Sequence, residues 1–490
     1  MRKFWMLGLF GGALMSVATA DLSGGAVTTK LKGIEIGGEV RARYTHNTPD
    51  YYDQATHAGI TRGRTESDDS GMLRTRLRAD LDAGDNVKGT IELQGVHVNG
   101  ATAVGVDDGT VTVRQGYLFA SDLMGQPLDL KVGRMALWYG NGDLLSSSDW
   151  ANASHHFDGA VLSFRANDKT KIDLGYAELV NGDVNDGGAL GSVSGSGGLY
   201  PARVAGTASD PDEDYDIYWL WLTSKITDEF TADVYDIMEY DGENDYRGET
   251  LYAYASDNWN GGSQATALDV HQGHLKRHTS GFQLNYDNGD FYGNAQWNGQ
   301  WGRLATDQIR AWGYAAHVGM RFDKEGANHD ASVGIREASG ESDPNDQEST
   351  RFRPLFSGSS HGYNGIQDMV GWTNSTAVFA KYGFNPMDKL RLTTTWTKFE
   401  RHDMDDSWYT DAGAVLRTGA GFDANNPDPK MGTSGSSDIG HEIDFVLNYT
   451  HSDFLDFEAG FSHFFQGRLA LDTADTSDAE FTYVQARLRF

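Results

Sequence analysis

Apolar and polar residues alternate with a period of two along much of the chain. In residues 481–490, Val484, Leu488 and Phe490 share one face, whereas Arg487 and Arg489 lie on the other. Successive side chains of a β-strand point to opposite faces, so this period predicts strands. Similar segments of about 9–11 residues, the length with which a tilted strand crosses a bilayer, recur along the chain. Their polar faces combine arginine with glutamate or aspartate, which indicates a wet lumen rather than one side of a soluble sandwich.

The pattern yields about eighteen strands, and we predict an all-β fold: a single transmembrane antiparallel up-and-down β-barrel. An even number of strands places both ends of the barrel in the periplasm. The predicted strands are residues 33–45, 72–82, 87–98, 110–120, 128–138, 155–166, 170–181, 214–225, 228–240, 274–286, 290–301, 309–323, 330–339, 374–384, 389–400, 440–450, 454–466 and 480–490.

Short and long connections occur between these strands. The short ones, such as 82–87 and 385–389, contain the Asn, Gly, Asp or Pro residues that turns require. Short periplasmic turns and long extracellular loops are the usual asymmetry of bacterial barrels. The sequence leaves open whether a loop such as 340–373 folds inward and blocks the pore. The long connections are rich in Gly, Ser and Asp and comprise residues 46–71, 182–213, 241–273, 340–373 and 401–439.

The N-terminus has the pattern of a secretory signal peptide. Arg2 and Lys3 precede an apolar run from Phe4 to Val17, and a small-x-small cleavage site ends at Ala20. The apolar run is too short to span a membrane as a helix. We therefore predict a signal peptide at 1–20, a short leader at 21–32 and a barrel with long acidic loops at 33–490. The predicted location is the outer membrane of a diderm bacterium.

Composition excludes several classes of function. The net charge of −30 is unlike the basic surface that binds nucleic acid. The chain has no cysteine, so disulfides and thiol catalysis are excluded. Neither a nucleophile elbow nor a zinc-protease motif is present, and the acidic loops lack the spacing of a calcium loop. We expect no catalytic residue, no metal and no cofactor.

Aromatic residues cluster near the ends of the predicted strands. At these positions we expect a girdle at the level of the lipid headgroups, and the alternative is a sugar-stacking track inside the lumen. The terminal Phe490, on an amphipathic last strand, is the predicted signal for the barrel assembly machinery. The girdle residues are Tyr44, Tyr117, Trp138, Tyr139, Tyr176, Trp219, Trp221, Trp297, Trp301, Tyr382, Trp396 and Tyr449.

Inward-facing arginines are the sharpest chemical feature. Closure of the barrel joins the last strand to the first, so arginines of the first, second and last strands gather on one wall. Guanidinium groups bind carboxylates in a bidentate way and stay charged, so the wall is predicted to guide anions. The predicted pore-lining residues from the strand pattern are Arg41, Arg43, Arg74, Arg76, Arg78, Arg391, Arg487 and Arg489.

Carboxylates on the same inner faces offer an alternative in which the ion pairs only brace the barrel. The two interpretations have equal weight: the arginines either guide anions or are neutralised by these carboxylates. The predicted acidic partners in the lumen are Glu35, Glu39, Asp80, Glu92, Glu442 and Asp444.

Two segments go beyond the general pattern of a barrel. The first is GRMALWYG at 133–140, followed by Trp-Ala-Asn at 150–152 and Phe-Asp-Gly at 157–159; the second lies between Phe356 and Thr376. Together they resemble the alginate-export family of outer-membrane porins. The resemblance implies an eighteen-stranded, monomeric channel that conducts an anionic polysaccharide through an arginine-lined lumen. It adds Arg134, which matches the Gly-Arg motif of the family, to the pore-lining residues.

We therefore predict a porin that passes anionic solutes, or an anionic oligosaccharide or polysaccharide, by diffusion. The chain departs from the alginate exporter in its shorter leader, its mixed acidic and basic lumen and its acidic loops. The first alternative is a general or sugar porin without anion preference. The second is a structural barrel that sheaths a redox partner or acts as an adhesin. The expected partners are outer-membrane lipid, the assembly machinery and the solute, but no nucleic acid.

Overall fold

A computed structural model describes most of the barrel wall and parts of several connections. The predicted signal peptide and leader lie outside the described residues. These are 33–48, 68–98, 111–152, 154–180, 215–241, 274–324, 326–343, 346–355, 364–410, 415–417, 436–473 and 478–490.

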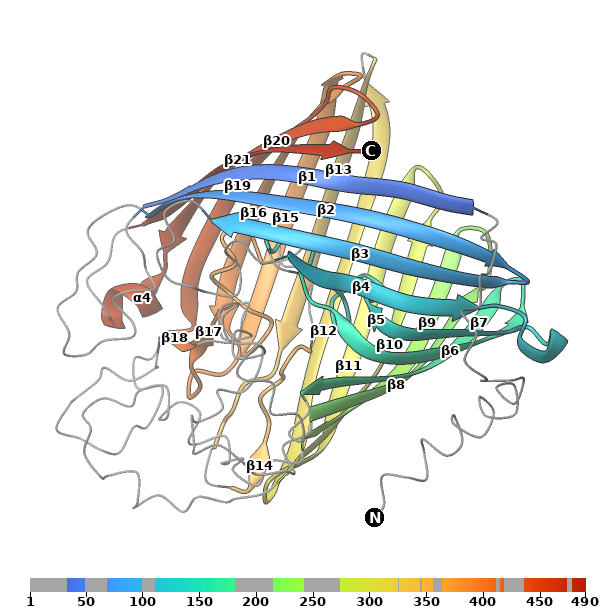
Figure 1. Ribbon diagram of the computed structural model, residues 1–490. Coiled ribbons are helices and arrows are strands. Elements are labelled where there is room, and N and C mark those ends of the chain that lie inside the picture. Colours follow the sequence, from blue (N-terminus) through green and yellow to red (C-terminus); the bar gives the residue numbers. More distant parts are fainter. Residues whose placement is uncertain are drawn as a thin grey trace.

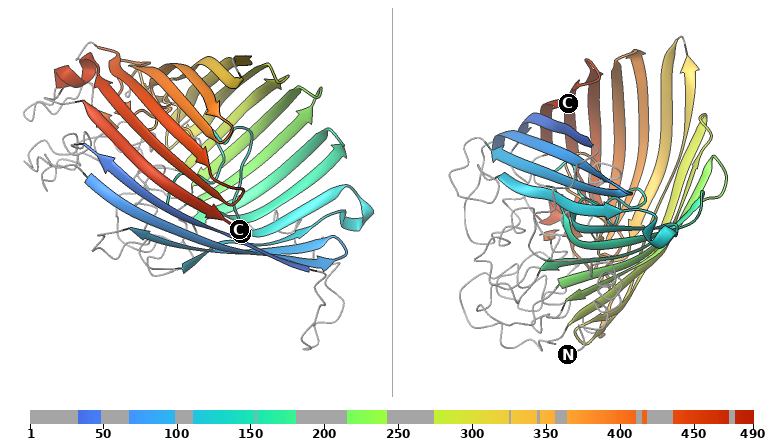
Figure 2. Two further views of the ribbon diagram at one scale, coloured as in Figure 1. Left: turned by 90° about the horizontal axis from the view of Figure 1, so that it is seen from above. Right: turned by 45° about the vertical axis from the view of Figure 1, so that its right-hand side comes forward.

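Eighteen long strands form one closed antiparallel ring (Figure 1 and Figure 2). Each pairs with the next long strand in the chain, and the last pairs with the first, from Glu39 opposite Arg489 to Asn47 opposite Phe481. The long strands are β1 (Gly33–Asn47), β2 (Asp68–Gly84), β3 (Val87–Val98), β4 (Val111–Ala120), β5 (Leu128–Met135), β6 (Phe157–Asn167), β7 (Thr170–Val180), β8 (Tyr215–Lys225), β9 (Phe230–Asp241), β10 (Leu275–Asp287), β11 (Phe291–Leu304), β12 (Asp307–Lys324), β13 (Ala327–Ala338), β15 (Ser375–Met387), β16 (Leu390–Arg401), β19 (Asp438–Thr450), β20 (Leu455–Gln466) and β21 (Ala479–Arg489).

Short elements occur in the connections. They are the 3₁₀ turn η1 (Leu123–Gly125), the strands β14 (Glu348–Ser349), β17 (Trp408–Tyr409) and β18 (Val415–Arg417), and the helix α4 (Arg468–Thr473). Within the described part of the chain, no helix is long and apolar enough to cross a membrane.

The predicted strand count and order are confirmed, and most predicted bounds lie within a few residues of the observed ones. The clearest difference is the segment predicted as 128–138. The strand ends at Met135, because the next residues leave the wall and enter the lumen.

The two faces of the wall have opposite chemistry. Apolar side chains such as Ile36, Leu77 and Val333 are exposed on the outside, where lipid covers them in a membrane. Polar side chains such as Arg74 and Asn298 are buried on the inside. This distribution of burial is the reverse of that in a soluble protein, and it explains why the period of two was readable in the sequence.

The girdle prediction is right for some aromatics and wrong for others. On the outer face, Tyr44, Trp297, Trp301, Tyr382, Trp396 and Tyr449 are exposed. In contrast, Trp219 and Trp221 lie inside the barrel, each with only 2% of its surface exposed, and Tyr139 packs against both. Tyr117 and Trp138 also face the lumen. Trp219 fits because its indole lies over Gly175 on the neighbouring strand, where a Cβ would lie 1.9 Å from the ring.

Candidate functional site

Residues 136–156 connect β5 to β6, and the described part of this connection, 136–152 and 154–156, lies in the lumen. It is held by an apolar cluster inside the barrel: Leu137, Leu144 and Leu145 pack in one cluster with Trp219 and Ile237 of the wall. Hydrophobic burial thus places a loop where a solute must pass. We call residues 136–156 the inward segment.

Arginines from β1 and β2 donate hydrogen bonds to the backbone of the inward segment. Arg41 donates from Nη1 to the Asp149 carbonyl (2.7 Å) and from Nη2 to the Ala151 carbonyl (3.0 Å). Arg74 donates from Nη1 to the same two oxygens at 2.9 and 3.1 Å. The register places Arg41 opposite Arg74 on one side and Arg487 on the other, as the sequence predicted.

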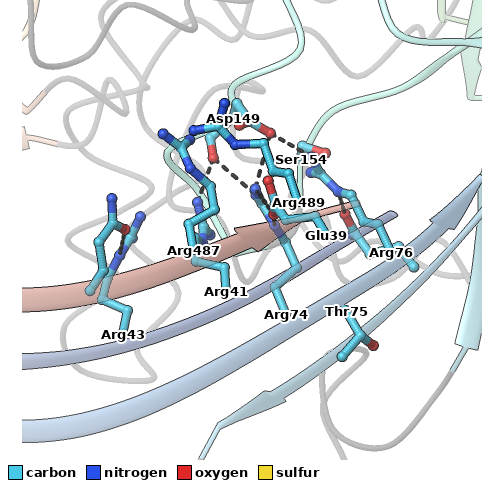
Figure 3. Close-up of polar contacts among 12 residues, drawn as sticks. Glu39, Arg41, Arg43, Arg74, Thr75, Arg76, Asp149, Ser154, Arg487 and Arg489 are labelled. Carbon is cyan, nitrogen blue, oxygen red and sulfur yellow. Dashed lines mark hydrogen bonds and ion pairs between the residues drawn. The ribbon is translucent and has the colours of Figure 1, made fainter. Parts of the chain in front are cut away.

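Two further arginines continue this contact along the wall. Arg76 donates from Nη1 to Oδ1 of Asp149 at 2.6 Å and from Nη2 to the Ser154 hydroxyl at 3.0 Å. Arg114 of β4 donates to the same hydroxyl at 2.7 Å. Figure 3 shows Arg41, Arg74 and Arg76 converging near Asp149, while Thr75 points to the other side of β2. We call Arg41, Arg74, Arg76 and Arg114 the arginine wall.

The charges of the inward segment are set by its surroundings. Burial raises the pKa of the Asp149 carboxyl, but the positive charges of Arg74 and Arg76 outweigh burial, so this pKa lies below its usual range. Burial lowers the pKa of His156 to about 4 and also lowers that of His155. At neutral pH Asp149 is therefore a carboxylate, and the imidazoles of His155 and His156 are uncharged.

The inward segment also reaches wall strands other than β1 and β2. Asn141 donates its N–H to Oε1 of Gln283 on β10 at 3.3 Å, and Asp143 lies 3.6 Å from Arg336 on β13. Gly140, with φ of +57°, permits this approach, since a Cβ there would lie 2.1 Å from the Gln283 oxygen. The segment consequently bridges the interior.

The described parts of the connection between β13 and β15 also lie inside the barrel, a possibility that the sequence left open. Arg351 forms a bidentate ion pair with Asp406, which lies in the connection between β16 and β19. The two distances are 2.8 and 2.6 Å, and both side chains are fully buried. Further along, Ile366 and Gln367 donate their N–H groups to Oε1 of Glu442 on β19 at 2.7 and 3.2 Å. Two connections therefore narrow the lumen.

The other predicted basic residues of the lumen have partners of their own. Arg43 donates to Gln485 and lies 3.6 Å over the Trp150 ring. Arg78 pairs with Asp80, Arg391 pairs with Asp330, and Arg487 and Arg489 both pair with Asp456. Of the predicted acidic partners, Glu39 pairs with Arg74 and Glu92 with Arg114.

Arg134 does not line the pore, which corrects the expectation drawn from the Gly-Arg motif. It is paired across the ladder with Gly116 and lies on the face opposite to Lys131 and Met135, which point inward. Its ion pair with Asp158 therefore lies on the outer face of the wall. β5 ends one residue after Arg134, so the alternation that would show the face of this residue is cut short, and the motif itself does not show it.

Two acidic predictions, Glu442 and Glu35, also need revision. Glu442 is buried beside the equally buried Asp444 and accepts N–H groups of the backbone, not a guanidinium. Glu35 is exposed near the start of β1, away from the inward segment.

Sequence reasoning missed Asp149 and Arg114. Asp149 lies in a connection that the sequence assigned to no site, although the neighbouring Trp150 belonged to a quoted motif. Arg114 and Gln115 both face inward because a bulge opposite Glu92 and Leu93 interrupts the period of two.

The chain matches the family model described as alginate export over residues 34–176 and 202–485. The chain belongs to the alginate export family. Its fold matches solved outer-membrane porins of Pseudomonas aeruginosa. OpdO has 12% identity and a TM-score of 0.55, covering 94% of this chain and 98% of its own. OpdL has 12% identity and a TM-score of 0.55, covering 93% and 98%.

A third similar structure is OccK2 (OpdF) in complex with glucuronate, with 13% identity and a TM-score of 0.54, covering 94% of this chain and 98% of its own. A search of curated protein sequences found no match. At these identities the solved structures inform on fold alone. Family and fold together identify a porin-type channel of a bacterial outer membrane.

Proposed function

We propose that this channel passes anionic solutes by diffusion and that the arginine wall selects them. The observation that supports the proposal is the convergence of guanidinium groups on Asp149 in the narrowed lumen. Arginine stays charged at any physiological pH, and a charge in a narrow, weakly hydrated passage acts more strongly than one in bulk water. A solute carboxylate can take the place of the Asp149 carboxylate or of a carbonyl oxygen.

The local balance of charge favours an anion. Arg41, Arg43, Arg74, Arg76 and Arg114 supply five positive charges around Asp149, Trp150 and Ser154, and Glu39, Glu92 and Asp149 supply three negative ones. Five minus three leaves two positive charges at the constriction, although the whole chain carries −30. Bracing ion pairs and anion guidance thus coexist in one wall.

We further propose that the solute is a sugar acid or an oligomer of sugar acids. Alginate, which the description of the family names, is a polymer of such acids, and the similar OccK2 structure contains glucuronate. Diffusion through the barrel requires no catalysis, cofactor or metal. We expect a monomer that is inserted by the barrel assembly machinery through the signal at Phe490.

Reversal potentials of single channels in planar bilayers, across a gradient of potassium chloride, test the proposal. We expect the wild type to favour chloride over potassium. Replacing Arg74, Arg76 and Arg78 with Ser should abolish this preference, whereas Arg134→Ser, on the outer face, should retain it. A wild-type channel that prefers potassium contradicts the proposal. A channel without preference supports the general porin, and absence of conductance supports a structural barrel.

A further inference from the structure

A cavity lies beside the inward segment, toward the end of the barrel with the short turns. It has a volume of about 300 Å³, is partly open and is lined by residues of β4 to β8 and by residues 136–140. Lys131 and Lys171 line it near the starts of β5 and β7, which follow the turns at 121–127 and 168–169. Short turns mark the periplasmic end of bacterial barrels, so this cavity opens on the periplasmic side of the arginine wall.

An indole ring is available in this cavity. Trp138 lines it with 56% of its surface exposed, although it lies inside the barrel. The ring is held in place, since its Nε1 donates to the Gly140 carbonyl at 3.2 Å and Gly142 packs beneath it. The backbone of Trp138 is fixed by a β-bridge to Ser146. A rigid, exposed aromatic face inside a cavity is suited to stack on a flat or weakly polar ring.

A positive charge faces the same space. The Lys131 ammonium lies 4.0 Å over the Tyr117 ring, and in the described part of the chain no carboxylate lies within ion-pair distance of it. The other cation, Lys171, pairs with Asp173 at 2.8 Å, and Asp173 also accepts the Ser163 hydroxyl at 2.5 Å. Lys131 is therefore the group that remains able to bind a carboxylate.

We propose that this cavity is a binding subsite for a single-ring sugar acid, with the apolar face of the ring on Trp138 and the carboxylate on Lys131. The inference rests on the proposed function, because it assumes that an anion crosses the arginine wall. The volume is at the lower end of the roughly 300–1,000 Å³ of small-molecule sites, so the cavity holds one sugar unit and not a folded oligomer. The subsite gives an anion a second position in sequence with the arginine wall, which fits conduction through several weak sites.

Calorimetric titration of the detergent-solubilised full chain tests the subsite. Glucuronate is the probe, and glucose is the matched probe that keeps the ring but lacks the carboxylate. Lys131→Gln should weaken glucuronate binding about tenfold and leave glucose binding unchanged, because an ammonium–carboxylate pair in a cavity contributes on that scale. Trp138→Leu should weaken both. Trp301→Leu removes an exposed indole from the outer face and should change neither.

The reversal potential of the same variants separates this subsite from the proposed function. Anion preference should persist in Lys131→Gln and Trp138→Leu, since the arginine wall is intact in both. Glucuronate binding that neither variant weakens, or no binding to the wild type, overturns the subsite even if the channel prefers anions. A wild-type channel that shows no anion preference overturns the proposed function, whatever the titration shows.

Discussion

Two walls of the barrel hold inward connections with opposite chemistry. The arginine wall donates hydrogen bonds to carbonyl oxygens of residues 149 and 151. On β19, Glu442 instead accepts hydrogen bonds from the amides of Ile366 and Gln367. One wall supplies positive donors and the other a carboxyl oxygen as acceptor, and each meets the complementary group of a peptide backbone.

The two walls differ in whether a solute can replace the contact that the wall makes with its connection. The side chain of Asp149 is 45% exposed, whereas the guanidinium groups that it contacts are buried, so a solute carboxylate would reach these donors by displacing Asp149. Glu442 and Asp444 are buried completely or almost so. A buried acceptor surrounded by backbone is suited to hold a connection permanently, whereas donors that are covered by an exposed carboxylate are suited to exchange ligands. The comparison therefore separates a binding surface from a structural support.

The largest expected effect is on the stability of the arginine wall. Arg74→Ser removes the partner of Glu39, of Asp149 and of two carbonyl oxygens, and we expect a loss of about 3–5 kcal/mol in the free energy of unfolding. Urea unfolding of the barrel in lipid vesicles, followed by tryptophan fluorescence, measures it. Arg134→Ser breaks a partly exposed ion pair and should cost no more than about 1 kcal/mol. Equal losses would mean that burial inside the lumen does not strengthen these contacts.

The next effect concerns the support on β19. Glu442→Ala leaves the amides of Ile366 and Gln367 without their acceptor, and we expect a loss of about 1–3 kcal/mol in the same unfolding measurement. Glu442→Gln retains a side-chain oxygen that can accept both hydrogen bonds, so it should be close to neutral. If the Gln variant is as unstable as the Ala variant, the hydrogen bonds to this oxygen do not hold the connection.

A smaller effect is expected on selectivity. Asp149→Asn keeps the carbonyl oxygen that binds Arg41 and Arg74 but removes the negative charge beside Arg76. We expect the ratio of chloride to potassium permeability to rise about two- to fivefold. Glu442→Gln is the control, since it makes the same change from carboxyl to amide on the other wall, and its ratio should stay close to that of the wild type. A fall in the ratio for Asp149→Asn would contradict anion guidance by the arginine wall.

The smallest effect is the response to pH. The pKa of His156 is lowered to about 4 by burial, and that of Asp149 is lowered by the arginines. Between about pH 8 and 5, His156 therefore stays neutral and Asp149 stays ionised. Anion preference should accordingly stay constant over that range. The pKa of His156 is lower in the folded than in the unfolded protein, so this residue favours the folded state at higher pH. Its contribution to the free energy of unfolding is complete above about pH 6.5 and is lost as the pH falls toward 4. Unfolding of His156→Gln should show a weaker dependence over this window.

Much of the barrel was determined by the sequence. A strand that has lipid on one side and water on the other must alternate, so the number, order and approximate bounds of the strands were readable. Closure then followed from the count, and it predicted that Arg41 and Arg74 share one wall with Arg487. These features depend on local patterns and on a ring in which each strand neighbours the next.

Tertiary structure decided what lies inside the ring. Residues 136–156 have no period that marks them as buried, and only their packing against Trp219 and Ile237 carries Asp149 to the arginines. The inward position of Trp219 depends on Gly175, a neighbour on another strand. Arg134 faces outward although a motif suggested the lumen. Alternation fixes each strand relative to the bilayer, but a loop in the lumen is placed by contacts between distant segments, which a pattern along the chain does not encode.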